Sequence, residues 1–137
     1  MDEIYSVKLS KVIEEFDLES IYLPDLPDNI LITCTRINRP GLQMVGFYDH
    51  YEQQRLQIIG KVENLFLAGL DAAERASRLE DFYKSTPAGV IYTTSLPIDD
   101  EVIALAEKYR VPLLRTTKSS SDFMAALIAF LTISIKK

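Results

Sequence analysis

The stretch that decides the fold runs from Val90 to Arg115 and reads VIYTTSLPIDDEVIALAEKYRVPLLR. It begins with β-branched and aromatic residues typical of a buried strand, and it ends with a second apolar run at residues 111–115. Between the two runs, apolar residues recur at the three- and four-residue spacing of an amphipathic helix: Ile98, Val102, Leu105, Ala106 and Tyr109. A strand, a helix and a strand with short connections predict a parallel, right-handed α/β unit.

Further elements flank this unit on both sides. Residues 119–122 offer capping side chains for a last helix that reaches Leu131. Upstream, residues 55–59 predict a short strand and residues 61–67 a short helix. Residues 71–83 predict a longer helix whose first residue, an aspartate, caps it. The alternation of strands and helices therefore extends over most of the chain.

The N-terminal part is less regular. Residues 29–37 are rich in β-branched side chains and predict one largely buried strand. Ser6 is the expected cap of a first helix that ends near Asp17. Residues 42–52 show no clean period, so we expect an irregular segment with a helical turn there. The whole pattern predicts a protein of the α/β class.

The composition limits the class of protein. The chain has 137 residues, of which 47% are hydrophobic and 26% charged, and we expect one globular domain over residues 1–137. The formal net charge of −5 argues against a nucleic-acid partner. Cys34 is the only cysteine and cannot form an internal disulfide, and the longest apolar run, residues 123–131, is too short to span a membrane. We therefore expect a cytoplasmic protein that contacts no membrane.

Few residues of the chain are suited to catalysis. Gly60 and Lys61 form the only Gly-Lys pair, and the residues around them do not complete a phosphate-binding P-loop. Cys34 and His50 are too few to hold zinc. We predict no catalytic residue, no metal site and no cofactor in this chain. An enzyme built on a Cys34–His50 nucleophile pair is the weakest alternative.

Two places are suited to bind an anion. Ligands of parallel α/β units collect beyond the carboxyl ends of the strands, where hydroxyls and two cations, Arg115 and Lys118, occur here. The candidate ligand-binding residues at these ends are Thr94, Ser95, Arg115, Thr116 and Thr117. Arg39 is the second candidate, in a turn that Pro40 makes rigid and that we expect to need a positive φ at Gly41. The alternatives are that the hydroxyls cap helices and turns, and that Arg39 holds a nearby carboxylate.

The segment Ile37–Gln43, INRPGLQ, resembles the Asn-Arg-Pro-Gly-Leu motif in the N-terminal domain of bacterial HPr kinase/phosphorylases. The resemblance continues in order through GFY at 46–48, RLQIIGKVE at 55–63, VIYT at 90–93 and PLLRT at 112–116. It covers residues 4–131 with collinear spacing. The motif positions that we expect to be structural are Asn38, Arg39, Pro40, Gly41, Gly60 and Lys61.

The resemblance implies a three-layer α/β domain with a mixed, mainly parallel sheet, similar also to the UDP-binding N-terminal domains of some Mur ligases. In the family, the chemistry belongs to a separate P-loop domain that uses ATP and Mg²⁺ and acts on the phosphocarrier HPr. Its catalytic residues have no counterpart in this chain. We therefore expect a non-catalytic regulatory and assembly domain of the phosphotransferase system, involved in carbon-catabolite control. The alternative is a stand-alone module that senses a nucleotide-sugar or a phosphorylated metabolite.

The last predicted helix is apolar on all sides over residues 123–131. A helix of this kind is normally covered on more than one side, and a small sheet covers only one. We therefore expect self-association through this helix, with the P-loop kinase domain as a further partner in a longer protein and HPr reached only through that domain. The alternative is a central helix covered by the loop at residues 24–27.

Overall fold

A five-stranded sheet forms the middle layer of the structure, a computed structural model that describes residues 5–135. Its strand order is β2–β7–β6–β5–β4. Neighbouring strands among β4 (Ile37–Asn38), β5 (Leu56–Ile59), β6 (Gly89–Tyr92) and β7 (Leu113–Arg115) are parallel. The edge strand β2 (Glu19–Tyr22) runs antiparallel to β7. These strands confirm the predicted α/β class with a mixed, mainly parallel sheet.

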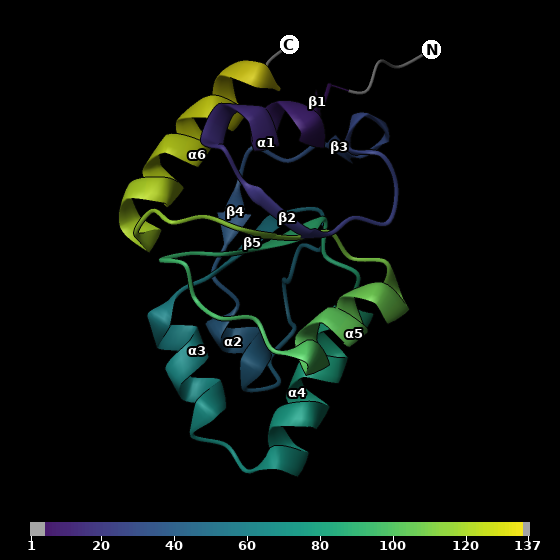
Figure 1. The fold of residues 1–137 in the computed structure, drawn as a ribbon, viewed down its shortest axis with the longest axis vertical. Helices are drawn as coiled ribbons and strands as arrows, with labels where there is room; N and C mark the ends of the chain where they lie inside the picture. Colours follow the sequence, from purple (N-terminus) through teal and green to yellow (C-terminus); the bar gives the residue numbers. More distant parts are fainter. Residues whose placement is uncertain (1–4, 136–137) are drawn as a thin grey trace.

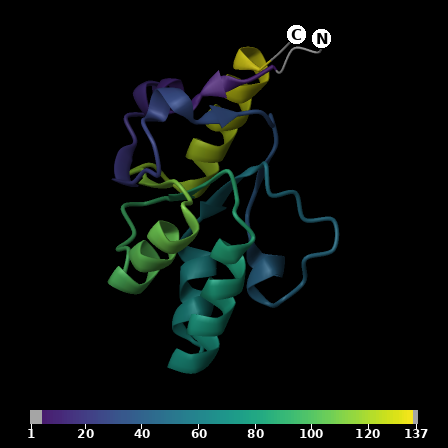
Figure 2. The same ribbon diagram turned by 90° about the vertical axis from the view of Figure 1, so that its right-hand side faces the viewer.

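Helices cover both faces of this sheet (Figures 1 and 2). One layer holds α2 (Gly41–Met44), α3 (Lys61–Ala68), α4 (Ala72–Lys84) and α5 (Asp100–Tyr109). The opposite layer holds α1 (Leu9–Phe16) and α6 (Ser120–Ser134), together with a 3-10 turn at Pro27–Asn29. Beside them, β1 (Val7–Lys8) and β3 (Leu31–Ile32) form a separate antiparallel pair. The three layers agree with the expected architecture.

Each face of the sheet supports its own hydrophobic core, because successive side chains of a strand point to opposite faces. Ile91 and Leu114 belong to the core under α1 and α6. Val90 and Leu113, their neighbours in sequence, belong to the core under α4 and α5. Strands buried on both faces are mostly apolar, which is why the sequence of β6 and of Leu113 and Leu114 in β7 shows no polar alternation.

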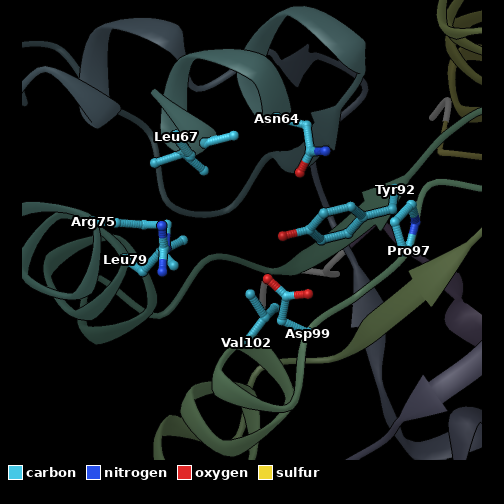
Figure 3. Close-up of a pocket in the computed structure, with 9 residues that line it drawn as sticks. Asn64, Leu67, Arg75, Leu79, Tyr92, Pro97, Asp99 and Val102 are labelled. Carbon is cyan, nitrogen blue, oxygen red and sulfur yellow. The ribbon is translucent and has the colours of Figure 1, made fainter. Parts of the chain in front are cut away.

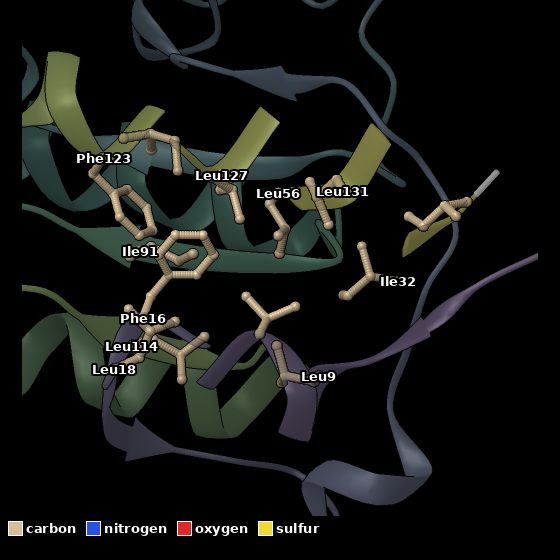
Figure 4. Packing of buried hydrophobic residues seen from close by; sticks show 13 residues of the cluster. Leu9, Phe16, Leu18, Ile32, Leu56, Ile91, Leu114, Phe123, Leu127 and Leu131 are labelled. Atoms are coloured by element: carbon tan, nitrogen blue, oxygen red, sulfur yellow. The ribbon is translucent and has the colours of Figure 1, made fainter. Parts of the chain in front are cut away.

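Helix α6 packs one side against the sheet and α1 (Figure 4). Phe123, Leu127 and Leu131 are completely buried, at the spacing of one helical face. The Phe123 ring meets the Phe16 ring edge to face, with 5.4 Å between the ring centroids. The Ser119 Oγ accepts a hydrogen bond from the Asp122 N–H, which confirms the predicted cap of this helix.

Two of the predicted N-terminal elements are wrong. Residues 29–37 do not form one strand: β3 pairs with β1 outside the main sheet, and the chain crosses to that sheet before β4 begins at Ile37. Ser6 does not cap the first helix, because residues 7–8 are extended in β1 and the helix begins only at Leu9. Strand β2 was missed altogether, since two of its four residues are exposed and no alternation marks it.

The turn at Pro40 and Gly41 also differs from the expectation. Gly41 has no positive φ, and a side chain built on it would meet no atom within 4 Å. The glycine with a left-handed backbone is Gly46, at φ 93°. Pro40 instead is the residue that immediately precedes α2, and its carbonyl accepts a hydrogen bond from the Met44 N–H at 3.0 Å. The helical turn predicted within residues 42–52 is therefore present, and it begins at Gly41.

The predicted elements of the middle of the chain are confirmed. Strand β5 and helix α3 lie where the sequence predicts them. Asp71 caps α4, with its Oδ1 accepting a hydrogen bond from the Glu74 N–H at 2.8 Å. Among residues 5–135, none of the helices combines the length and hydrophobicity needed to cross a membrane.

Candidate anion-binding crevice

A crevice opens at the carboxyl edge of the parallel strands, between helices that leave on opposite faces of the sheet. Helix α3 follows β5 on one face, and α6 follows β7 on the other. The cavity between their first turns has a volume of about 320 Å³ and is lined by Arg39, Lys61, Val62, Thr94, Ser119, Ser120 and Ser121. Such a divergence at the carboxyl ends of the strands is where open α/β sheets bind ligands.

Arg39 is held in this crevice by Glu63. The Arg39 Nη2 donates a hydrogen bond to the Glu63 Oε1 at 2.9 Å. The same carboxylate oxygen accepts a hydrogen bond from the Gly60 N–H at 2.7 Å. Glu63 is the third residue of α3 and only 7% exposed, so it reaches back to the residue that precedes its own helix. The alternative in which Arg39 holds a carboxylate is therefore realised within the chain.

Gly60 is required here by close packing. A Cβ atom on it would lie 2.4 Å from the Ser120 Oγ and 2.5 Å from the Arg39 Nη2. A side chain at this position would therefore displace the Ser120 hydroxyl and the Arg39 guanidinium from their present places. The close approach of the Arg39 guanidinium to Gly60 thus accounts for both of these residues of the sequence motif.

Hydroxyl groups join the loops on the α6 side. The Thr93 and Ser120 hydroxyl oxygens lie 2.6 Å apart, and Thr93 is fully buried. Thr94 and Ser95 both have a left-handed backbone, at φ 58° and 51°. Their N–H groups donate to the Lys118 and Thr116 carbonyls at 2.8 and 2.9 Å, which ties the loop after β6 to the loop after β7.

The electrostatics of the crevice favour an anion. Lys61 and Arg39 bring two cations, and the positive ends of the α3 and α6 dipoles both open into it. Glu63 offsets the charge of Arg39, whereas Lys61 makes no ion pair with the residues that the structure describes. The cations, hydroxyls and helix N-termini of the crevice are suited to bind an anion.

The structure brings only some of the predicted site residues together. Arg39 and Thr94 line the crevice, but Ser95, Arg115 at the end of β7, and Thr116 and Thr117 after it do not. Arg115 instead binds Glu19 with two hydrogen bonds, Nε–Oε1 at 2.9 Å and Nη2–Oε2 at 3.0 Å. This pair lowers the pKa of Glu19 and raises the pKa of Arg115.

The other two predicted residues after β7 have different surroundings. Thr116 is buried, and its Oγ1 accepts a hydrogen bond from the Lys118 N–H at 3.2 Å. Thr117 is exposed. Thr116 thus fits the turn-capping alternative.

The sequence analysis did not predict that Glu63 binds Arg39 in the crevice or that Ser119, Ser120 and Ser121 line it. Glu63 carried a signal, because an acidic residue three positions after Gly60 fits the spacing of half a capping box. Ser119 to Ser121 were read only as helix caps, although they line the crevice. The remaining motif residue, Asn38, donates from Nδ2 to Gln43 Oε1 at 3.0 Å and to Gln57 Oε1 at 2.7 Å, a buried amide network that fixes the turn.

Cys34 and His50 are not brought together in one cavity. Cys34 is buried, and it does not line the pocket to which the exposed His50 belongs. Within residues 5–135 no cluster of histidine, cysteine and acidic side chains is suited to hold a metal ion.

Phosphate is expected to bind the crevice weakly, with a Kd in the millimolar range. In an NMR titration, the amide resonances of Lys61 and residues 119–121 should shift, and Lys61→Gln should weaken binding severalfold because it removes the unpaired cation. Arg115→Gln is the matched control and should leave the Kd unchanged, since its side chain is bound to Glu19. Unmoved resonances at tens of millimolar phosphate would show that the crevice is structural only.

The fold and the crevice together define a class: a three-layer α/β domain that positions polar groups at one edge of its sheet. The family described as "HPr Serine kinase N terminus" matches residues 7–131. The chain belongs to this family.

The curated relatives are HPr kinase/phosphorylases. The protein of Caldanaerobacter subterraneus subsp. tengcongensis is 38% identical over 125 residues, covering 91% of this chain and 41% of the relative. Those of Clostridium perfringens and Streptococcus uberis are 32% and 34% identical over 126 residues, covering 92% of this chain and 40% and 41% of the relatives. The chain thus spans about 40% of the length of the curated relatives it matches.

A solved structure shares the fold at low sequence identity. It contains the CBS and DRTGG domains of the regulatory region of Clostridium perfringens pyrophosphatase, complexed with the activator diadenosine tetraphosphate. The TM-score is 0.64 at 15% identity, and the match covers 95% of this chain and 50% of that chain. At this identity the likeness concerns the fold alone.

Proposed function

We propose that the chain is a non-catalytic regulatory and assembly domain of an HPr serine kinase/phosphorylase, acting in bacterial carbon-catabolite control. The observation that carries the proposal is the family match over residues 7–131 in a chain that contains no P-loop sequence. Phosphoryl transfer needs groups that cradle the nucleotide phosphates and place Mg²⁺. The crevice supplies two cations and helix N-termini, which suit it to hold an anion without acting on it.

The assembly role is supported by the outer face of α6. While Phe123, Leu127 and Leu131 face the core, Ile128 is 42% exposed and Ile133 is 72% exposed on the other side. The same side of the helix carries the exposed small residues Ala125 and Ala129, which let a second helix approach closely. The face is covered by the same face of a second copy of the chain, because an apolar helix face of this kind can pack against itself across a twofold axis.

Sedimentation measures this self-association. The wild type is expected to form a dimer, and the double variant Ile128→Glu/Ile133→Glu a folded monomer, because both side chains point away from the core. Phe130→Glu is unsuitable, since the Phe130 ring packs against Phe16 with 5.6 Å between the ring centroids. Leu65→Glu on α3 is the matched control: it is 70% exposed on a different helix and should leave the dimer intact.

Two outcomes contradict the α6 interface. One is a wild type that stays monomeric at high concentration. The other is a dimer that Leu65→Glu dissociates and the α6 variant does not, which would move the interface to the exposed apolar residues of α2 and α3.

A further inference from the structure

A second cavity, separate from the crevice, lies on the other side of the loop after β6. It has a volume of about 230 Å³ and sits between α3, α4 and the start of α5, with Tyr92 of β6 at its floor (Figure 3). Its residues are Asn64, Leu67, Ala68, Arg75, Leu79, Tyr92, Pro97, Asp99 and Val102. None of them lines the crevice at the α6 N-terminus.

Tyr92 presents a buried hydroxyl to this cavity. The residue is 2% exposed, and its ring points into the space between Arg75 and Asp99 (Figure 3). The buried Tyr83 hydroxyl is the neighbour of the Tyr92 hydroxyl and influences its pKa, but it has no hydrogen-bond partner of good geometry. Burial raises the pKa of Tyr92 to about 12, so the hydroxyl keeps its proton at neutral pH. A phenol can accept a hydrogen bond from one neighbour and still donate its own proton to water or to a ligand in the cavity.

Three more polar side chains converge on the same cavity. Asp99 precedes α5 but makes no side-chain capping hydrogen bond, and the Asn64 amide makes none with the described residues. The Arg75 Nε is buried and has no hydrogen-bond partner, although Glu101 Oε1 lies 3.5 Å away. One cation, one carboxylate, an amide and a phenol therefore line a cavity without satisfying one another.

The remaining walls are apolar. Leu67, Leu79 and Val102 are buried and face the cavity from three helices. A cavity of about 230 Å³ is smaller than the roughly 300–1,000 Å³ that holds drug-sized ligands, so it accepts a molecule of amino-acid size. Apolar walls between one positive and one negative side chain suit a molecule with both charges and a hydrocarbon body.

We propose that this cavity binds a small aliphatic α-amino acid, the carboxylate of the ligand facing Arg75 and its ammonium group facing Asp99. The Tyr92 hydroxyl and the Asn64 amide bind the polar end of the ligand, and its side chain packs on Leu67, Leu79 and Val102. This site makes no use of the crevice or of the α6 face, and it stands apart from the proposed regulatory role. It gives the domain a neutral metabolite as a ligand.

The experiment is an NMR titration of the whole chain with L-leucine and two analogues that each lack one charge, 4-methylpentanoate and 3-methylbutylamine. L-leucine is expected to shift the amide resonances of Asn64, Leu67 and Val102, and each analogue to bind about tenfold more weakly. Tyr92→Phe keeps the buried ring and should also weaken leucine binding about tenfold. Asp99→Asn keeps a residue that suits the start of α5 and should abolish the preference for leucine over 4-methylpentanoate.

The control is Lys61→Gln, which lies in the crevice and should leave leucine binding unchanged. The proposal is overturned if L-leucine moves none of these resonances at tens of millimolar, or if all three probes bind equally well. It is also overturned if Tyr92→Phe, folded as judged by its dispersed spectrum, binds leucine like the wild type.

Discussion

Replacing Glu63 with alanine is expected to lower the free energy of unfolding by about 2–3 kcal/mol. The Glu63 carboxylate accepts hydrogen bonds from the Arg39 Nη2 and the Gly60 N–H and is 7% exposed. Removing one partner of a buried pair costs roughly 3–5 kcal/mol, but Arg39 is about a third exposed and regains part of its hydration. The measurement is a urea unfolding midpoint at neutral pH.

Glu63→Gln is the matched variant, because it keeps an oxygen acceptor for the Gly60 N–H and removes only the charge. It should lose about 1 kcal/mol, less than the alanine variant. Equal midpoints for Glu63→Ala and the wild type would show that the contact does not hold α3 against Arg39.

Phe123→Ala is expected to lower the free energy of unfolding by about 3–5 kcal/mol. The ring is completely buried between the sheet and α1 and packs edge to face against Phe16. Its removal leaves a cavity at the start of α6, beside the crevice. Leu65→Ala is the control and should change stability by at most about 0.5 kcal/mol, because Leu65 is 70% exposed.

Phosphate binding gives a second readout for Phe123→Ala. Because Phe123 sits in the first turn of α6, loss of its packing should also weaken phosphate binding at residues 119–121. A Phe123→Ala protein as stable as the Leu65→Ala control would contradict the core described for this face.

The middle and C-terminal parts of the fold were predictable because the hydrophobic pattern of each segment matches the place that the segment takes in the folded structure. Strand β6 and the two leucines of β7 are buried, and they therefore appear in the sequence as short apolar runs. The N-terminal part was not predictable in the same way. Strand β2 gains its place only by pairing with β7, about ninety residues further along the chain, and its own four residues carry no alternation.

The candidate site was also predictable only in part. Its location at the carboxyl edge of the strands follows from the order of the elements alone, and Thr94 was expected there from the sequence, whereas Arg39 was expected at a separate place that the structure brings to the same crevice. Arg115 was expected at the same site, but its role is decided by Glu19, which sits on the strand that the sequence pattern did not indicate. The need for Gly60 arises from the approach of Ser120 and Arg39, two residues distant in sequence, and no local signal reveals it.

The central claim is that this domain takes part in an HPr kinase/phosphorylase without performing its chemistry, and transfer of phosphate from ATP to HPr tests it most directly. The rate should be measured with Mg²⁺ for this chain alone, for the Caldanaerobacter relative that is 38% identical, and for a chimera in which this chain replaces the matching 125 residues of that relative. The account predicts no phosphorylated HPr with the chain alone, and a chimera as active as the relative at saturating substrate. Phosphorylation of HPr by the isolated chain, or a folded chimera without kinase activity, would contradict the account.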